Sequence, residues 1–205
     1  MPPRHALLHL PPRAPAEPLA RAWLAAQWGV DAQALPLARD TRGRPRLAGT
    51  MAHRDANWSH SGEHRLVACG EAMHIGCDLE RIRPRPNARA LAGRFFHPNE
   101  AAWLDGLPDA EAEAAFLRLW CAKEAVLKAH GHGISFGLHR FRLADGGGGG
   151  EGKGDDGLRI VECDPRLGDA AAWRLHEFRP VAGYLGAIAW HPLDETMGCA
   201  AIIPA

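Results

Sequence analysis

Lysine is scarce in this chain of 205 residues, because only three of its 24 basic residues are lysines and the other 21 are arginines. The formal net charge is zero, since 24 acidic residues balance the 24 basic ones. A chain without excess positive charge has no overall attraction for nucleic acid or for an anionic membrane. We therefore expect neither of them as a partner.

Long hydrophobic runs are also absent. No stretch approaches the roughly 20 apolar residues that a membrane-spanning helix needs. The apolar run near the start of the chain is too short for a secretion signal, and prolines interrupt the segment at residues 2–3 and 11–12. We expect a cytoplasmic protein, and a monomer.

Cysteine is present but not in a pattern that builds a site. The five cysteines are odd in number and widely spaced, and no C-x-x-C occurs. This excludes a disulfide framework and a zinc knuckle, and it favours reduced thiols that are buried as small apolar side chains.

Glycine is abundant, with 23 residues, but the phosphate-binding pattern G-x-x-x-x-G-K-[ST] is missing. Five consecutive glycines fall in residues 145–157 together with several charges. This composition predicts a flexible surface loop.

The remaining composition, 46% apolar and 23% charged, is that of a globular protein. Residues 17–30 have the spacing of an amphipathic helix. Residues 66–69 and 73–79 are predicted to be two short strands of one hairpin. The proline-punctuated basic segment 81–86 predicts an extended connector, so we place an N-terminal half at residues 1–86.

The C-terminal half, residues 87–205, contains two predicted helices followed by strands. Asn99 has the position of a helix cap, and a longer helix is predicted over residues 109–130, ending at Gly131. Strands are predicted at residues 158–163, 173–178, 184–190 and 199–203. Helices and strands in this order indicate an α+β protein made of two similar halves.

The first chemical motif is Gly76-Cys77-Asp78-Leu79-Glu80. Because alternate side chains of a strand share a face, Asp78 and Glu80 point the same way. Paired carboxylates repel each other unless a cation lies between them, and hard oxygen ligands suit Mg²⁺. The simpler alternative is a solvated strand end.

The second motif lies in the long helix. Spacing by four places Trp120, Glu124 and Lys128 along one side, next to the apolar stripe. An acid and a base four residues apart usually form a surface ion pair. Here the pair borders apolar residues, so we expect it to face a crevice.

The third motif is Asn57-Trp58-Ser59-His60-Ser61-Gly62. Hydroxyl and imidazole groups at a strand-to-turn junction can hydrogen-bond a phosphate, although a simple turn is the alternative. A Ser–His nucleophile is disfavoured, because adjacent residues of a strand point to opposite faces.

In this order and spacing the three motifs resemble the 4'-phosphopantetheinyl transferase superfamily, and specifically its surfactin-activator type. Phe95-Phe96 near Glu100 and the segment 131–141 also match the family pattern. The resemblance implies two pseudo-symmetric α+β halves in one chain, with the active site in the cleft between them.

The resemblance also implies a ligand set. Asp78, Glu80 and Glu124 would bind Mg²⁺, and Lys128 would contact the pyrophosphate of coenzyme A, the co-substrate. Ser59 and His60 would contact its phosphates. Arg44 occupies the position of a family lysine in a G-K-P turn, and a guanidinium can still bind phosphate.

The implied reaction transfers the 4'-phosphopantetheine arm of coenzyme A to a serine of an acyl or peptidyl carrier protein and releases 3',5'-ADP. Glu124, or Glu100 through a water, would accept the serine proton. Two alternatives remain. One is a non-catalytic module of the same fold that binds coenzyme A or the carrier protein. The other is a metal-dependent phosphohydrolase, which would not explain Trp120, Lys128 and the Ser59-His60 pair together.

The N-terminus departs from the family. Relatives carry a Lys/Arg-dense segment there for the 3'-phosphate and adenine, whereas this chain is rich in Pro and Ala before Arg21. Candidate substitutes are Arg39, Arg42 and Arg54. A further arginine series is either a solvated connector or a surface for an acidic carrier-protein helix; it comprises Arg81, Arg83, Arg85, Arg89 and Arg94.

Overall fold

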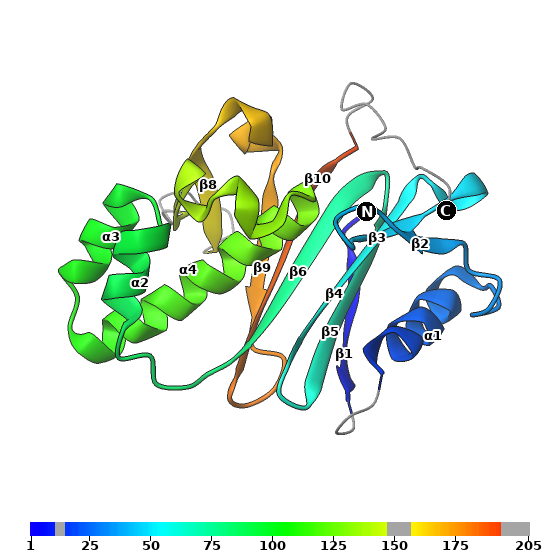
Figure 1. Cartoon of the computed structure of the whole chain (residues 1–205), viewed down its shortest axis with the longest axis horizontal. Coiled ribbons are helices and arrows are strands. Elements are labelled where there is room, and N and C mark those ends of the chain that lie inside the picture. The colour runs from blue at the N-terminus through cyan, green and yellow to red at the C-terminus, as the bar shows by residue number, and fades with distance from the viewer. Residues whose placement is uncertain (11–14, 147–156, 194–205) are drawn as a thin grey trace, which may run out of the picture.

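Two three-stranded antiparallel sheets form the centre of the computed structural model, which describes residues 1–10, 15–146 and 157–193 (Figure 1). The first sheet has the order β1-β5-β4, from β1 (Arg4–His9), β5 (His64–Glu71) and β4 (Arg54–Ser61). The second has the order β6-β10-β9, from β6 (Met73–Arg81), β10 (Tyr184–Pro192) and β9 (Arg174–Phe178).

One long helix packs on each sheet. α1 (Ala16–Trp28) buries Leu24 against Val67 and Cys69 of the first sheet and ends at Gly29, whose φ of 65° suits glycine. α4 (Asp109–His130) lies on the second sheet, and Gly131 ends it with a φ of 88°.

Shorter elements complete the fold. Two small helices, α2 (Ala88–Phe95) and α3 (Pro98–Asp105), pack beside the start of α4 (Figure 1). Two small antiparallel pairs flank the main sheets, β2 (Leu37–Arg39) with β3 (Pro45–Leu47) and β7 (Phe141–Asp145) with β8 (Leu158–Cys163). Single 3-10 turns occur at Gly49–Met51, Gly133–Phe136, Leu138–Arg140, Pro165–Leu167 and Ala170–Ala172.

The two sheets meet along β4 and β6, which run parallel (Figure 1). Alternate side chains of β4 bond the backbone of β6 here. Ile75 N donates to Asp55 Oδ2 at 2.9 Å, and Cys77 N donates to Asn57 Oδ1 at 3.1 Å. Arg81 N donates to Ser61 Oγ at 3.0 Å. These bonds hold the motif strand β6 in register with β4.

Several predicted elements are confirmed. The long helix covers residues 109–130 as expected, and β8 covers residues 158–163. Helices combined with antiparallel sheets agree with the α+β class, while the boundary at residue 86 stays a prediction. The predicted strand 199–203 and most of the glycine-rich segment lie outside the described residues.

The predicted hairpin of residues 66–69 and 73–79 is wrong. Both segments are strands, but β5 pairs with β1 and β4, whereas β6 pairs with β10. The actual hairpin joins β4 to β5 at Gly62, whose φ of 57° suits a turn. Alternating apolar residues identify a strand but do not identify its partner.

Two local predictions also change. His97, and not Asn99, caps α3: His97 Nδ1 accepts from Asn99 N, while Glu100 Oε2 accepts from His97 N. Strand β1 was not predicted.

Among the described cysteines, all four are free, and Cys69, Cys77 and Cys121 are buried as expected.

No helix in the described ranges combines the length and the apolar character needed to cross a membrane.

Candidate active site

Gly76 sets the distance between α4 and the motif strand β6. A Cβ atom at this position would lie 2.2 Å from the backbone oxygen of Ala125 and 2.2 Å from the backbone nitrogen of Ala129. Any side chain at residue 76 would therefore push α4 away from the sheet. The first glycine of the G-x-D-x-E motif thus explains how acids on β6 and residues on α4 come together.

Lys128 of α4 reaches across this contact. Its Nζ donates to Asp78 Oδ1 at 2.6 Å and to Ser59 Oγ at 3.0 Å, and Ser59 Oγ donates to Asp78 Oδ1 at 2.8 Å. Burial lowers the pKa of Lys128, but the charge of Asp78 outweighs it and the net pKa is raised. Lys128 is therefore a charged ammonium at neutral pH.

Two further carboxylates join this cluster. The pKa of Glu124 is raised to about 7, chiefly by burial and also by the charges of Asp78 and Glu80, against the opposing charge of Lys128. Burial and the charge of Asp78 also raise the pKa of Glu80, while Arg85, 3.4 Å away, lowers it. The three acids thus lie close enough to repel one another.

The acids suit a divalent cation. Within the described ranges, no group of three or more His, Cys, Asp or Glu side chains has the geometry of a metal site. However, Asp78 Oδ2 and Glu124 Oε1 are buried without a hydrogen-bond partner in those ranges. Buried carboxylate oxygens that lack donors fit a hard cation, which prefers oxygen ligands.

An aromatic group supports the acid cluster. Trp120 packs against Phe95, Phe96 and Phe116, with ring centroids 5.8 to 6.4 Å apart. Its side chain also hydrogen-bonds Glu80, which lowers the pKa of that acid. Trp120 therefore connects the hydrophobic core around α4 to the acid cluster.

A basic pocket of about 470 Å³ opens beside Lys128. It lies between the β2–β3 turn, β4 and the end of α4, and its cationic side chains are Arg39, Arg42, Arg44 and Lys128. Arg44 is buried, pairs with Asp55 and donates to Ile75 O at 2.8 Å. Its Nε and Nη1 have no partner among the described residues. The lining of the pocket is therefore positively charged, which suits an anion.

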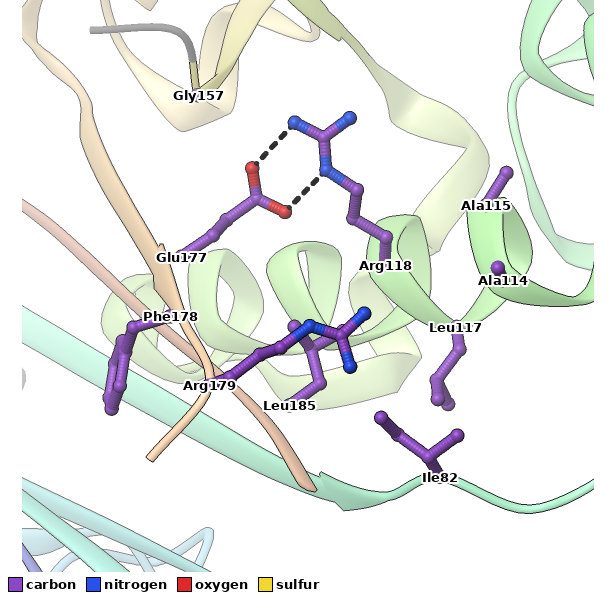
Figure 2. Close-up of a pocket in the computed structure, with 10 residues that line it drawn as sticks. All are labelled: Ile82, Ala114, Ala115, Leu117, Arg118, Gly157, Glu177, Phe178, Arg179 and Leu185. Atoms are coloured by element: carbon purple, nitrogen blue, oxygen red, sulfur yellow. Dashed lines mark hydrogen bonds and ion pairs between the residues drawn. The ribbon is translucent and has the colours of Figure 1, made fainter. Parts of the chain in front are cut away.

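A second pocket, of about 550 Å³, is mostly apolar (Figure 2). Ile82, Leu117 and Leu185 line it, and Arg118 and Glu177 form a two-bond ion pair at its side. Leu185 pairs with Glu80 across the sheet. This pocket therefore borders the acid cluster through Glu80.

The comparison with known proteins decides the family. Residues 74–177, which include the β6 motif and all of α4, match the model of the 4'-phosphopantetheinyl transferase superfamily. The chain belongs to this superfamily.

Named transferases agree with this assignment. The chain is 33% identical over 180 residues to the 4'-phosphopantetheinyl transferase HetI of Nostoc sp. strain PCC 7120, covering 84% of this chain and 69% of HetI. It is 36% identical over 130 residues to AcpT of Escherichia coli K12, covering 60% of this chain and 66% of AcpT. It is 42% identical over 93 residues to psf-1 of Bacillus pumilus, covering 44% of this chain and 39% of psf-1.

Most of the residues predicted for a phosphopantetheinyl transferase site do meet. Asp78, Glu80, Glu124, Lys128 and Ser59 form one group, and Arg44 lines the neighbouring pocket. Of the two residues expected to face a crevice, Lys128 lines the basic pocket, whereas Glu124 is not among the residues that line it.

Two predicted residues lie apart from that group. Glu100 is buried, and its carboxylate pairs with Lys123 Nζ at 2.8 Å and accepts from Leu143 N at 2.7 Å. None of these partners belongs to the acid cluster. His60 is exposed and points to the face of β4 opposite Ser59, because neighbouring strand residues alternate.

The sequence analysis did not predict the roles of two charged residues, one beside the site and one in the core. Asp55 forms an ion pair with Arg44 and accepts a hydrogen bond from Ile75 N. Lys123 forms an ion pair with Glu100 inside the core. The position of Asp55 two residues before Asn57 was a signal, because alternate residues of one strand share a face. Nothing local distinguishes buried Lys123 from a surface lysine.

Proposed function

We propose that this chain transfers the 4'-phosphopantetheine arm of coenzyme A to a serine hydroxyl of an acyl or peptidyl carrier protein and releases 3',5'-ADP. The observation that carries this proposal is the grouping of Lys128 with three mutually repelling acids beside a basic pocket, in a member of this superfamily. A cytoplasmic monomer is part of the proposal.

We also propose that the chain has the architecture of the surfactin-activator type. Each three-stranded sheet carries one long helix, and both units lie in one chain. The basic pocket is lined from both sides of the β4–β6 junction. These features support two related halves with the active site in the cleft between them.

Coenzyme A would place its phosphates in the basic pocket. Lys128, Arg42 and Arg44 line the pocket with positive charge, and a guanidinium binds phosphate oxygens in pairs. Ser59 keeps Lys128 and Asp78 in place through its two hydrogen bonds. The nucleotide would then lie on the Arg42–Arg44 side of the acids.

Asp78, Glu80 and Glu124 would hold the Mg²⁺ ion. When bound, the ion would neutralise charge on the diphosphate during phosphoryl transfer. The ammonium of Lys128 stabilises the same charge, because it lies at the boundary between the acids and the basic pocket.

The serine oxygen forms a bond to the β-phosphorus, and the bond from that phosphorus to the bridging oxygen breaks, so 3',5'-ADP leaves. The serine proton needs an acceptor. Glu124 is the better candidate because its Oε1 has no donor, whereas the oxygens of Glu100 are engaged by Lys123, His97 and Leu143. We assign the base to Glu124.

The carrier protein would approach on the side of Glu80. Within the arginine series, Arg85 pairs with Glu80 and Arg89 pairs with Asp109 at 2.5 Å. Arg81 and Arg83 are exposed and form no ion pair in the described residues, so they remain available to an acidic helix.

Mass spectrometry of the carrier tests the proposal. Apo carrier proteins from fatty acid, polyketide and nonribosomal peptide systems are each incubated with the protein, coenzyme A and Mg²⁺. The expected result is the added mass of one phosphopantetheine on at least one carrier, lost when Asp78 is replaced by Ala. Binding of coenzyme A with no added mass on any carrier would instead support the non-catalytic module.

A further inference from the structure

His132 lines the basic pocket from the segment that follows α4. It lies between Gly131 and Gly133, whose φ angles of 88° and 59° turn the chain out of the helix. The imidazole ring stacks on His130, with centroids 4.4 Å apart and planes inclined by 28°, and its centroid lies 6.2 Å from that of the Phe136 ring. These neighbours hold the ring beside the pocket, and the proposed transfer step gives it no role.

The positive charge of the pocket is largely balanced by acids of the protein. Three of its four cations are paired with a carboxylate; the pairs are Arg39 with Glu17, Arg44 with Asp55 and Lys128 with Asp78. The fourth, Arg42, forms no ion pair within the described ranges. The diphosphate of coenzyme A is a dianion at neutral pH, and the 3'-phosphate adds further negative charge. A ligand of this kind therefore brings more charge than the unpaired cation can balance.

In the free protein His132 faces positive charge. Arg42 lies near it in the β2–β3 turn, and Arg166, which pairs with Asp164 at 2.8 Å, lies near it in the 3-10 turn Pro165–Leu167. The pKa of His132 is lowered, chiefly by burial and also by the charges of these two arginines, against an opposing hydrogen bond to the backbone of His130. The pKa of His130 is about 4, so the stacked ring is uncharged at neutral pH. His132 is therefore neutral near pH 7.

A phosphate beside His132 would reverse this balance, because an opposite charge within about 4–6 Å favours the charged form of a titratable group. We propose that His132 takes up a proton when coenzyme A binds, so that its contribution to the affinity increases as the pH falls from about 8.5 to about 6. This inference rests on the proposed function. It adds a regulation of the same site, in which pH sets the affinity for the co-substrate.

The test compares the wild type with His132→Gln, which cannot take up a proton, and with His132→Lys, which carries a charge at every pH used. Coenzyme A and Mg²⁺ are titrated calorimetrically into each protein without a carrier. At about pH 6 we expect His132→Gln to bind coenzyme A at least about threefold more weakly than the wild type and His132→Lys. At about pH 8.5 His132→Lys should bind at least about threefold more tightly than the wild type and His132→Gln.

The number of protons taken up on binding is a second readout. It is obtained by repeating the titration at about pH 6.5 in buffers of different ionisation enthalpy. The wild type should take up at least about 0.3 proton more than either variant. Glu124, whose pKa is about 7, and coenzyme A itself are the same in all three experiments, so the difference belongs to His132.

His53→Gln is the matched control, because His53 is exposed and is not among the residues that line the pocket. This control should keep the affinity and the proton uptake of the wild type. A role of His132 in stacking alone would weaken binding in both variants at both pH values, and that result would overturn the inference. Equal proton uptake by the wild type and His132→Gln would also overturn it, and so would a wild type that binds no coenzyme A.

Failure of the proposed function looks different. The wild type would then bind coenzyme A with the expected proton uptake at His132 but add no phosphopantetheine to any carrier protein. That result would refute the transfer reaction and support the inference about His132.

Discussion

Lys128 Nζ lies 2.6 Å from Asp78 Oδ1, a contact between a helix and a strand that are 50 residues apart in the chain. The contact depends on Gly76, because any larger residue would separate α4 from β6. The position of Lys128 is therefore determined by a glycine, which itself has no side chain that could take part in a reaction.

Gly76→Ala should destabilise the protein by about 1–3 kcal/mol, because the added methyl overlaps the α4 backbone. It should also reduce transfer, since Lys128 moves away from Asp78. Urea unfolding and the initial transfer rate measure the two effects. Gly93→Ala is the matched control: nothing lies within 4 Å of its Cβ position in α2, so alanine should be neutral or stabilising. Equal stability of the two variants would refute the packing argument.

Breaking the buried ion pair of Lys123 and Glu100 should affect stability and not the chemical step. Lys123→Met leaves Glu100 buried without its cation, and we expect a loss of about 3–5 kcal/mol of unfolding free energy. Glu100→Gln should likewise destabilise the fold.

The double variant Lys123→Met/Glu100→Gln should recover part of this loss, because it leaves no unpaired charge. The folded fraction of Glu100→Gln should keep a kcat close to that of the wild type. A kcat reduced a hundredfold or more in folded Glu100→Gln would instead make Glu100 the base.

His130 should make the stability depend on pH. Burial, reinforced by the charge of His132, lowers the pKa of His130 to about 4 from the ordinary 6.5. Between these values the unfolded ring takes up a proton that the folded ring does not, so stability is lost as the pH falls from about 6.5 towards 4.

The comparison for this prediction is His130→Gln, whose amide can still donate to Arg166 O as the ring does at 3.0 Å. Because the ring is only partly buried, we expect the unfolding free energy of the wild type to fall by about 1 kcal/mol more than that of the variant between pH 6.5 and 4. Denaturant unfolding at several pH values measures this free energy for both proteins. If the unfolding free energies of both proteins changed in parallel with pH, His130 would not be the cause of the pH dependence.

The sequence predicted the helix and the strand that carry the motifs better than it predicted the topology of the sheets. Helix 109–130 and the G-x-D-x-E strand were both predicted, since apolar periodicity and motif spacing are local. That β6 pairs with β10, more than 100 residues later, could not be predicted, because strand pairing depends on contacts across the whole chain. The burial of Glu100 and Lys123 could not be predicted for the same reason, because it also depends on contacts between distant segments.

The most direct test of the account is the initial rate of phosphopantetheine transfer by Lys128→Met and Glu124→Gln against the wild type, at saturating coenzyme A and Mg²⁺, for proteins shown by unfolding to be folded. We predict that each variant loses at least about a hundredfold in kcat, because each removes a charged group that acts at the reacting phosphate. A folded variant of either residue with a near-wild-type kcat would contradict the account.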